Sequence, residues 1–315
     1  MRARNGISVA AAALTLAGCM AGGVKTSPTP PERPDRAARP VVAIPGRSPE
    51  SLALEAYYAR VQADLLARGL LRRDGGGPDT PFNARTLTEN FVRIALFDEY
   101  TERGGAMVAS QTESRLRRWS APVRLQVSFG PLVPLKQRSA DLASINAYAG
   151  RLARAARHPI STVTRGGNFH VVIMNEDERK AFGPQLRRIV PGVSDTVVRT
   201  VQNMPRSTFC LVFAFSEGNS SDYVKAVAII RAEHPDLLRL SCIHEEISQG
   251  LGLANDSPRA RPSIFNDDEE FALLTTHDEL LLRMLYDKRL KPGMTSFEAS
   301  PIARAIADEL VGGSI

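Results

Sequence analysis

The chain has 315 residues, of which 43% are hydrophobic and 23% charged, and its formal net charge is +6 at pH 7. This hydrophobic share is enough for a packed core. Beyond the N-terminal segment, no apolar run approaches the roughly 18 residues that suggest a membrane-spanning helix, so the sequence excludes a bundle of such helices.

The N-terminal segment has the pattern of a secretory signal that ends in a lipobox. Two Arg precede an apolar run from Ile7 to Ala17, and Leu16-Ala17-Gly18-Cys19 follows. We therefore predict a lipoprotein signal peptide at residues 1–18 and acylation of Cys19, which anchors the protein to the membrane. Several acyl chains give a stable anchor, at about 0.8 kcal/mol per buried CH₂. The alternative is an ordinary signal peptide with an incidental Cys19.

The expected location is the bacterial cell envelope. Met20 follows Cys19 where an Asp would favour inner-membrane retention, so the periplasmic face of the outer membrane is favoured. An exported protein meets little nucleic acid, and no nucleic-acid partner is expected. The net charge falls to +4 once Arg2 and Arg4 leave with the signal. This charge suits anionic lipid or a cell-wall polymer, although a solvated Arg-rich surface is the simpler explanation.

Residues 19–50 carry the lipidated Cys and then a stretch rich in Pro, Ser, Thr and Arg without apolar periodicity. Pro-rich linkers stay extended, at about 3.1 Å per residue. The segment is therefore predicted to be a disordered tether that holds a domain several tens of Å from the membrane. An ordered arm along the domain is the alternative.

The remaining residues, 51–315, are expected to form a single α+β globular domain. Apolar residues at helical spacing predict helices, and alternating or short apolar runs predict strands. The predicted helices are 52–71, 87–101, 141–157, 177–189 and 297–310, and the predicted strands are 122–130, 169–174, 209–215 and 223–231. A further, central helix is expected to start at His234-Pro235-Asp236.

The central helix carries CIHEEISQGLGLANDS, from Cys242 to Ser257, which begins like the HExxH motif of zinc hydrolases. In that motif two His four residues apart hold the metal, and the Glu acts on the metal-bound water. Here His244 and Glu245 open the motif, but Ser248 stands where the second His is required. A Ser hydroxyl is a poor zinc ligand, so the strict motif fails.

The second half of this stretch has the spacing of the HxxGxxHD tail of metzincin peptidases if one residue is treated as inserted. Gln249 and Asn255 then stand where His would be. Gln249 lies about 140° from His244 on an ideal α-helix, and a one-residue π-bulge would bring the two nearly into line. The candidate site is therefore His244, Gln249, Asn255 and Asp256 as metal ligands, with Glu245 as general base and zinc as the metal.

Three interpretations of the helix stay open: a zinc hydrolase with unusual ligands, a peptidase fold that has lost its metal, and an unrelated core helix. His244 falls inside the border of an apolar helix face, which is typical of a core histidine. The donors offered are one His, one poor Ser and two amides, so we predict substoichiometric zinc at most and no tightly bound cofactor.

Cys210 and Cys242 remain as an even pair once Cys19 is set aside. In an oxidising compartment such a pair predicts a disulfide, which would tie strand 209–215 to the central helix. Two buried thiols are the alternative.

Two features follow the central helix. The acidic run at 266–270 offers oxygen ligands for Ca²⁺ but lacks the spacing of a calcium loop, so a solvated run is expected. Thr276 and Glu279 predict a capping box at the start of another helix, with His277 exposed in its first turn.

Three stretches, HEEISQGLGLANDS, PSIFNDDEEFALLT and DELLLRMLYDKRLKPGM, resemble the proteobacterial lipoproteins grouped as domain of unknown function 2927 (DUF2927). The resemblance covers residues 120–295 as a family-like core, and it implies no settled activity. The order of predicted elements is also similar to the N-terminal half of metzincin-like peptidases, in which the last hairpin strand forms an edge of the substrate cleft. This likeness implies a zincin-like, metallopeptidase-like domain with a small mixed sheet.

Two functional hypotheses follow. The first is an envelope lipoprotein with a degenerate zinc-peptidase-like domain that binds a periplasmic protein or cell-wall polymer without catalysis. The alternative is a metal-dependent hydrolase of peptide or cell-wall bonds, with His244 as ligand and Glu245 as general base. Ser248 favours the first hypothesis, because it removes a ligand that the chemistry ordinarily needs.

Overall fold

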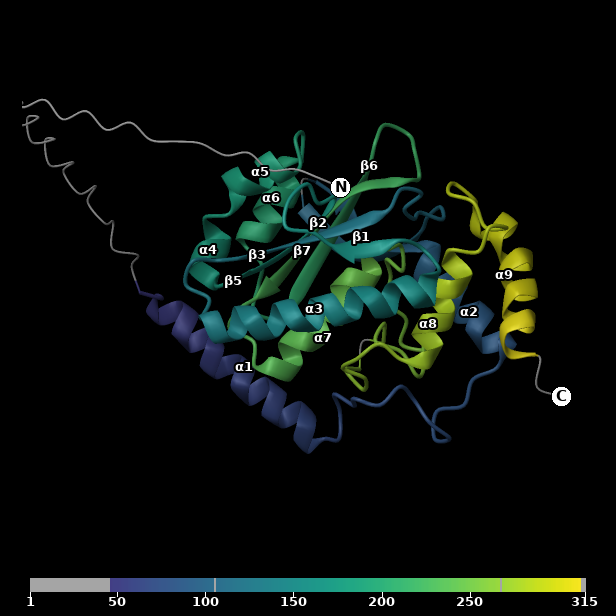
Figure 1. The fold of residues 1–315 in the computed structure, drawn as a ribbon, viewed down its shortest axis with the longest axis horizontal. Helices are drawn as coiled ribbons and strands as arrows, with labels where there is room; N and C mark the ends of the chain where they lie inside the picture. The colour runs from purple at the N-terminus through teal and green to yellow at the C-terminus, as the bar shows by residue number, and fades with distance from the viewer. Residues whose placement is uncertain (1–45, 105, 267, 313–315) are drawn as a thin grey trace, which may run out of the picture. The chain divides into compact units, whose positions relative to one another are not determined.

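The computed structural model describes residues 46–104, 106–266 and 268–312 (Figure 1). The predicted signal peptide, Cys19 and all but the last few residues of the predicted tether lie outside the described residues. The described residues fall within one compact unit, Ile44–Ile315. No helix among them is both long enough and apolar enough to cross a membrane.

The described chain contains both helices and strands. Its elements, in chain order, are α1 (Pro49–Ala67), α2 (Ala84–Ala95), β1 (Phe97–Arg103), β2 (Ala106–Glu113), β3 (Val123–Phe129), α3 (Leu135–Ala156), β4 (Ile160–Thr162), β5 (Phe169–Met174), α4 (Glu176–Lys180), α5 (Gly183–Ile189), α6 (Asp195–Gln202), β6 (Cys210–Ser216), β7 (Tyr223–Arg231), α7 (Asp236–Gln249), α8 (Thr276–Leu285) and α9 (Ser296–Val311). The α+β class is confirmed.

A mixed five-stranded sheet lies at the centre, in the order β4-β3-β5-β7-β6. Strands β3, β4, β5 and β7 are parallel, whereas β6 runs antiparallel to β7 at one edge, with Cys210 opposite Ile230 and Ala214 opposite Ala226. A separate antiparallel hairpin is formed by β1 and β2. Of the described strands, β7 is the only one that pairs with β6, so the outer edge of β6 is open to other partners.

Both faces of the sheet are covered, which explains the apolar runs 171–174 of β5 and 226–230 of β7. Val171 and Ile173 of β5 belong to the large core that includes residues of α3, α7 and α8. Val172 and Met174, which alternate with them, pack against α5 and α6 in a second core. Figure 1 shows α3 and α7 beside the sheet, and α5 and α6 together across the strands from α3.

Several predicted boundaries are wrong. The helix predicted at 87–101 ends at Ala95, and the chain then enters the β1–β2 hairpin, which the sequence analysis missed along with β4 and α6. The helix predicted at 177–189 is divided into α4 and α5. The end of the predicted tether is also corrected, because α1 starts at Pro49 with Ser48 as its cap.

Helix α7 is α-helical from Asp236 to Gln249, so the π-bulge considered above does not form. Fully buried Ile243 and Ile247 place it against the core. The chain turns away at Gly252, whose φ is +124°. A Cβ at Gly252 would lie 2.3 Å from the carbonyl oxygen of Arg117, so the close approach requires glycine there.

Candidate functional site

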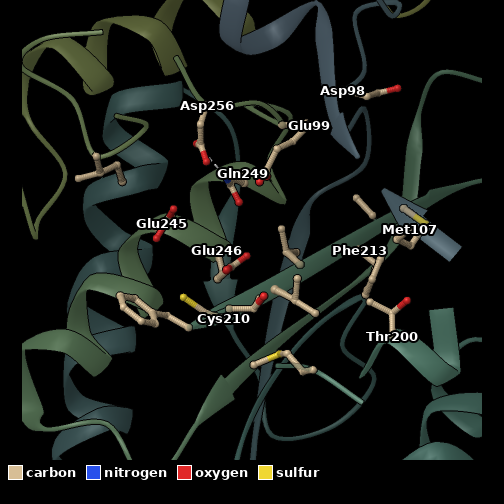
Figure 2. A pocket seen from close by; sticks show the side chains of 18 of the residues that line it. Asp98, Glu99, Met107, Thr200, Cys210, Phe213, Glu245, Glu246, Gln249 and Asp256 are labelled. Carbon is tan, nitrogen blue, oxygen red and sulfur yellow. Dashed lines mark hydrogen bonds between the residues drawn. The ribbon is translucent and has the colours of Figure 1, made fainter. Parts of the chain in front are cut away.

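A cavity of about 650 Å³ lies along β6 and is bounded by α7, by the β1–β2 hairpin and by the loop that follows α7 (Figure 2). Every residue from Cys210 to Ala214 lines it. Successive residues of a strand point to opposite faces of the sheet, so a run of five lining residues means that the edge of β6 itself faces the cavity. The pocket is therefore bordered by open strand edge on one side and by helix on another.

The lining of the pocket is strongly acidic. Its carboxylates are Asp98, Glu99, Glu245, Glu246, Asp256 and Glu269. Among the described lining residues, Arg117 is the only basic one, and both of its terminal nitrogens bind Asp98, at 2.9 and 3.2 Å. Five described carboxylates thus share the pocket without a basic side chain in its described lining.

Glu246 is the most deeply placed of these carboxylates. Its side chain is 4% exposed, and its Oε2 has no hydrogen-bond partner in the described part of the chain. Burial raises the pKa of Glu246 well above its ordinary value, and the charges of Glu99 and Asp256 raise it further. A buried carboxylate oxygen without a donor is costly, so this position is unfavourable for folding alone.

Glu245 shares this environment. It is partly buried, and burial raises its pKa well above the ordinary value, with the charges of Asp256 and Glu246 adding to the effect. Neighbouring carboxylates cannot both ionise cheaply in such a setting unless a cation joins them. Figure 2 shows Glu99, Glu245, Glu246, Gln249 and Asp256 gathered in one part of the pocket.

Two of the predicted metal ligands, Gln249 and Asp256, are brought together here. Gln249 Nε2 donates to Asp256 Oδ1 at 3.0 Å. Gln111 of β2 donates from Nε2 to the main-chain carbonyl of Asp256, also at 3.0 Å. The loop after α7 is thus fastened both to the helix and to the hairpin.

His244 is not among the described residues that line this pocket. Its Nδ1 accepts the Leu274 N–H at 3.1 Å, and its ring stacks on Tyr148 with centroids 3.8 Å apart. Burial, with a smaller effect of the Arg151 charge, lowers the pKa of His244 to about 3. The imidazole is therefore neutral, with Nδ1 acting as an acceptor.

Ser248 and Asn255 are also engaged away from the acidic group. The Tyr148 hydroxyl donates to the carbonyl of His244 at 2.9 Å and lies 2.5 Å from Ser248 Oγ. Asn255 is fully buried, and its Nδ2 donates to the carbonyl of Arg93 at 2.8 Å. Tyr148 thus occupies the side of α7 where a second metal-binding His would have to project.

The described residues do not fit a zinc site. Of the four ligands predicted from the sequence, His244 and Asn255 are held apart from Gln249 and Asp256. Cys210, Glu245 and Glu246 do place one candidate ligand atom each within 4.8 Å of the others. However, Cys210 is bonded to Cys242 and offers no thiolate. The general-base role of Glu245 stays a prediction.

The predicted disulfide between Cys210 and Cys242 is confirmed, with the two Cα atoms 5.9 Å apart. It joins the edge strand β6 to α7, which are two walls of the pocket. The relative position of strand edge and acidic helix is therefore fixed covalently.

Two pocket residues, Glu246 and Glu99, were not predicted from the sequence. Glu246 was not predicted because the HExxH pattern assigns a role only to the Glu that follows the first His, which is Glu245 here. Glu99 was hidden because it fell inside the helix predicted at 87–101, whereas it belongs to β1. One available signal was the Glu-Glu pair in the middle of a helix that carries Ile243 and Ile247 for burial.

Comparison with known proteins gives one family. The model of the family described as Protein of unknown function (DUF2927) matches residues 84–305, which extends beyond the 120–295 core expected from the sequence. No curated protein matches the chain. No solved structure matches it either.

Proposed function

The chain belongs to the DUF2927 family, and we propose that it is a non-catalytic binding protein of the bacterial cell envelope, anchored through Cys19. In this proposal the cleft between β6 and α7 holds an extended segment of a periplasmic protein as an additional strand. The observation that carries the proposal is the open edge of β6, which faces the pocket over five consecutive residues.

Strand addition suits the dimensions of this edge. β6 has seven residues, or about 23 Å of extended chain. Main-chain hydrogen bonds to an open strand supply affinity, and pockets for alternate side chains supply specificity. The cavity of about 650 Å³ is within the range of sites that bind side chains or small ligands.

A zincin-like architecture is part of the proposal. It is supported by the antiparallel edge strand β6, by its hairpin partner β7 and by the helix that follows them. The last hairpin strand was expected to border the cleft, as in metzincin-like peptidases; that strand is β7, which lies inside the sheet, and β6 is the hairpin strand at the edge. The proposed protein keeps such a cleft and uses it for binding.

Hydrolysis by a metal is less well supported than binding. The alternative function needs His244 as a ligand, but His244 is stacked on Tyr148 and accepts a hydrogen bond from Leu274. Because Nδ1 accepts this bond, the neutral ring carries its proton on Nε2, and a metal bound to either nitrogen would disrupt the bond from Leu274. Binding along β6 needs no change in these contacts of His244, because His244 is not among the described residues that line the pocket.

Pools of acetylated, amidated heptapeptides, randomised at every position, test the proposal. One pool is unmodified and the other is N-methylated at every backbone amide, and retention on the immobilised protein is measured by mass spectrometry. We expect retention of the unmodified pool alone, because strand addition needs the peptide N–H groups. Equal retention of both pools contradicts strand addition, and retention of cell-wall fragments in place of peptides assigns the cleft to a polymer.

A further inference from the structure

The acidic end of the pocket brings together the carboxyl groups of Glu245, Glu246 and Asp256. Glu246 is 4% exposed and lines the cavity of about 650 Å³, and its buried Oε2 has no hydrogen-bond donor in the described chain. Glu245, the preceding residue of α7, also lines the pocket, and the charge of Asp256 in the following loop acts on both glutamates. An orphaned carboxylate oxygen in this position calls for a donor that arrives with a ligand.

The size of the cavity decides between classes of cation. A bare divalent ion binds oxygens at about 2.0–2.6 Å, so it would fill only a small part of this volume. Cys210, the third member of the local ligand group, is committed to a disulfide. An organic cation fits the space better than a metal ion does.

The walls also suit a cationic side chain with a hydrocarbon stem. Met107 of β2 and Phe213 of β6 also line the pocket, and Figure 2 shows them on the side away from Glu245, Glu246 and Asp256. Lys and Arg place an aliphatic stem against apolar surface while their charged end seeks a polar partner. The pocket thus offers both surfaces in one cavity.

We propose that this pocket is a specificity pocket for a basic side chain, Lys or Arg, of the segment bound along β6, with Glu246 as its main partner. Glu245 and Asp256 add to the negative field. The inference rests on the proposed function, since the segment on β6 delivers the side chain. The charge-assisted hydrogen bond to Glu246 satisfies the orphaned oxygen.

Heptapeptide pools that differ only at the central position test this inference. One pool has Lys at the centre and the other has norleucine, which keeps the stem and removes the charge. Retention is measured on wild type, on Glu246→Gln, and on Glu89→Gln as a matched control. Glu89 is an exposed residue of α2 that pairs with Arg85, away from the pocket lining.

We expect wild type and Glu89→Gln to retain the Lys pool at least about tenfold better than the norleucine pool, as a charged hydrogen bond predicts. In Glu246→Gln the preference should disappear while the norleucine pool is retained as before. Thermal melting verifies that each variant is folded, and Asp256→Asn, with a weaker expected loss of preference, replaces Glu246→Gln if that variant does not fold.

The contrary results are distinct. Equal retention of both pools by wild type overturns the basic pocket and leaves strand binding in place. Retention of neither pool overturns both proposals. One Ca²⁺, Mg²⁺ or Zn²⁺ bound per wild-type chain, lost in Glu246→Gln and without any Lys preference, assigns the pocket to a metal ion and also overturns the inference.

Discussion

At the scale of single residues, Glu246 explains most of what the pocket can do. A buried carboxyl group faces Glu99 of β1, Asp256 of the following loop and Glu245 of its own helix. Such an arrangement stores unfavourable energy that a bound cation can release. The position is understandable as a binding feature and costly as a folding feature.

Glu246→Gln should therefore stabilise the free protein at neutral pH. The pKa of Glu246 is raised in the folded state, so the folded protein holds a proton that the unfolded chain releases above about pH 4.5. Stability is consequently lost as pH rises from there towards the folded pKa, and Gln suffers no such loss. We expect the melting temperature to rise by at least about 2 °C at neutral pH, and by much less near pH 4. A lower melting temperature at neutral pH would argue against an unsatisfied carboxylate.

His244 provides a second prediction, because its contacts are structural in this fold. His244→Ala should reduce the free energy of unfolding by about 1–3 kcal/mol, since it leaves the buried Leu274 N–H without an acceptor. Zinc content should not change, and wild type should contain substoichiometric zinc at most. Denaturant unfolding and elemental analysis measure the two quantities. One tightly held zinc per wild-type chain, absent from His244→Ala, would establish the metal-binding alternative.

Residue environments were predicted less well than elements were. His277 was expected to be exposed, yet it is fully buried, with Nε2 3.0 Å from Asn90 Nδ2 and its ring against Phe82. The capping box is formed by Thr275 and Asp278, one residue earlier than predicted. A local pattern shows that a helix starts nearby, but long-range packing decides which side chains are covered.

At the scale of elements, the site depends on how β6 and α7 are held together. The disulfide joins residues 32 positions apart in the chain, one in the strand and one in the helix. Trp119, from the segment before β3, also fixes the end of α7, because its indole N–H donates to the carbonyl of Gly250 at 2.8 Å. The pocket walls are thus rigid before a ligand arrives, which reduces the entropy lost on binding.

Replacement of both Cys210 and Cys242 by Ala should lower the free energy of unfolding by about 3–4 kcal/mol, according to the chain-entropy treatment of a loop of this length. Removal of both avoids a free thiol. Urea unfolding of the variant and of reduced wild type gives the comparison. Identical midpoints for oxidised wild type and variant would mean that the bond contributes no net stability.

The strands and helices with the clearest periodicity were predicted well. β5 and β7 have the predicted boundaries, because their apolar runs are bounded by turns and buried on both sides. The β1–β2 hairpin was missed because the apolar spacing of α2 was extended past Ala95. The Gly104-Gly105 pair that separates the strands was a hairpin signal in the sequence.

At the scale of the whole molecule, the cleft is proposed to face the periplasm from a lipid anchor. The lipobox that ends at Cys19 supports this arrangement, and a Pro-rich tether would give the domain reach. Tethering raises the local concentration of the binding domain near partners at the same membrane. Affinity for each single segment can then be modest.

The anchor is tested by palmitate labelling in a bacterial host. Wild type should incorporate the label and Cys19→Ala should not, because Cys19 is the proposed attachment site of the acyl chains. After cell fractionation, wild type should be found in the membrane fraction and the variant in the soluble periplasmic fraction. Equal labelling of both proteins would contradict acylation at Cys19.

The central claim, that a segment with a basic side chain adds to β6, is tested most directly by amide hydrogen exchange of the full chain with and without a retained Lys-centred peptide. We predict slower exchange in Cys210–Ser216 when the peptide is bound, and no change in β4, which forms the other edge of the same sheet. Unchanged exchange in β6, or protection at β4 in its place, would contradict the account.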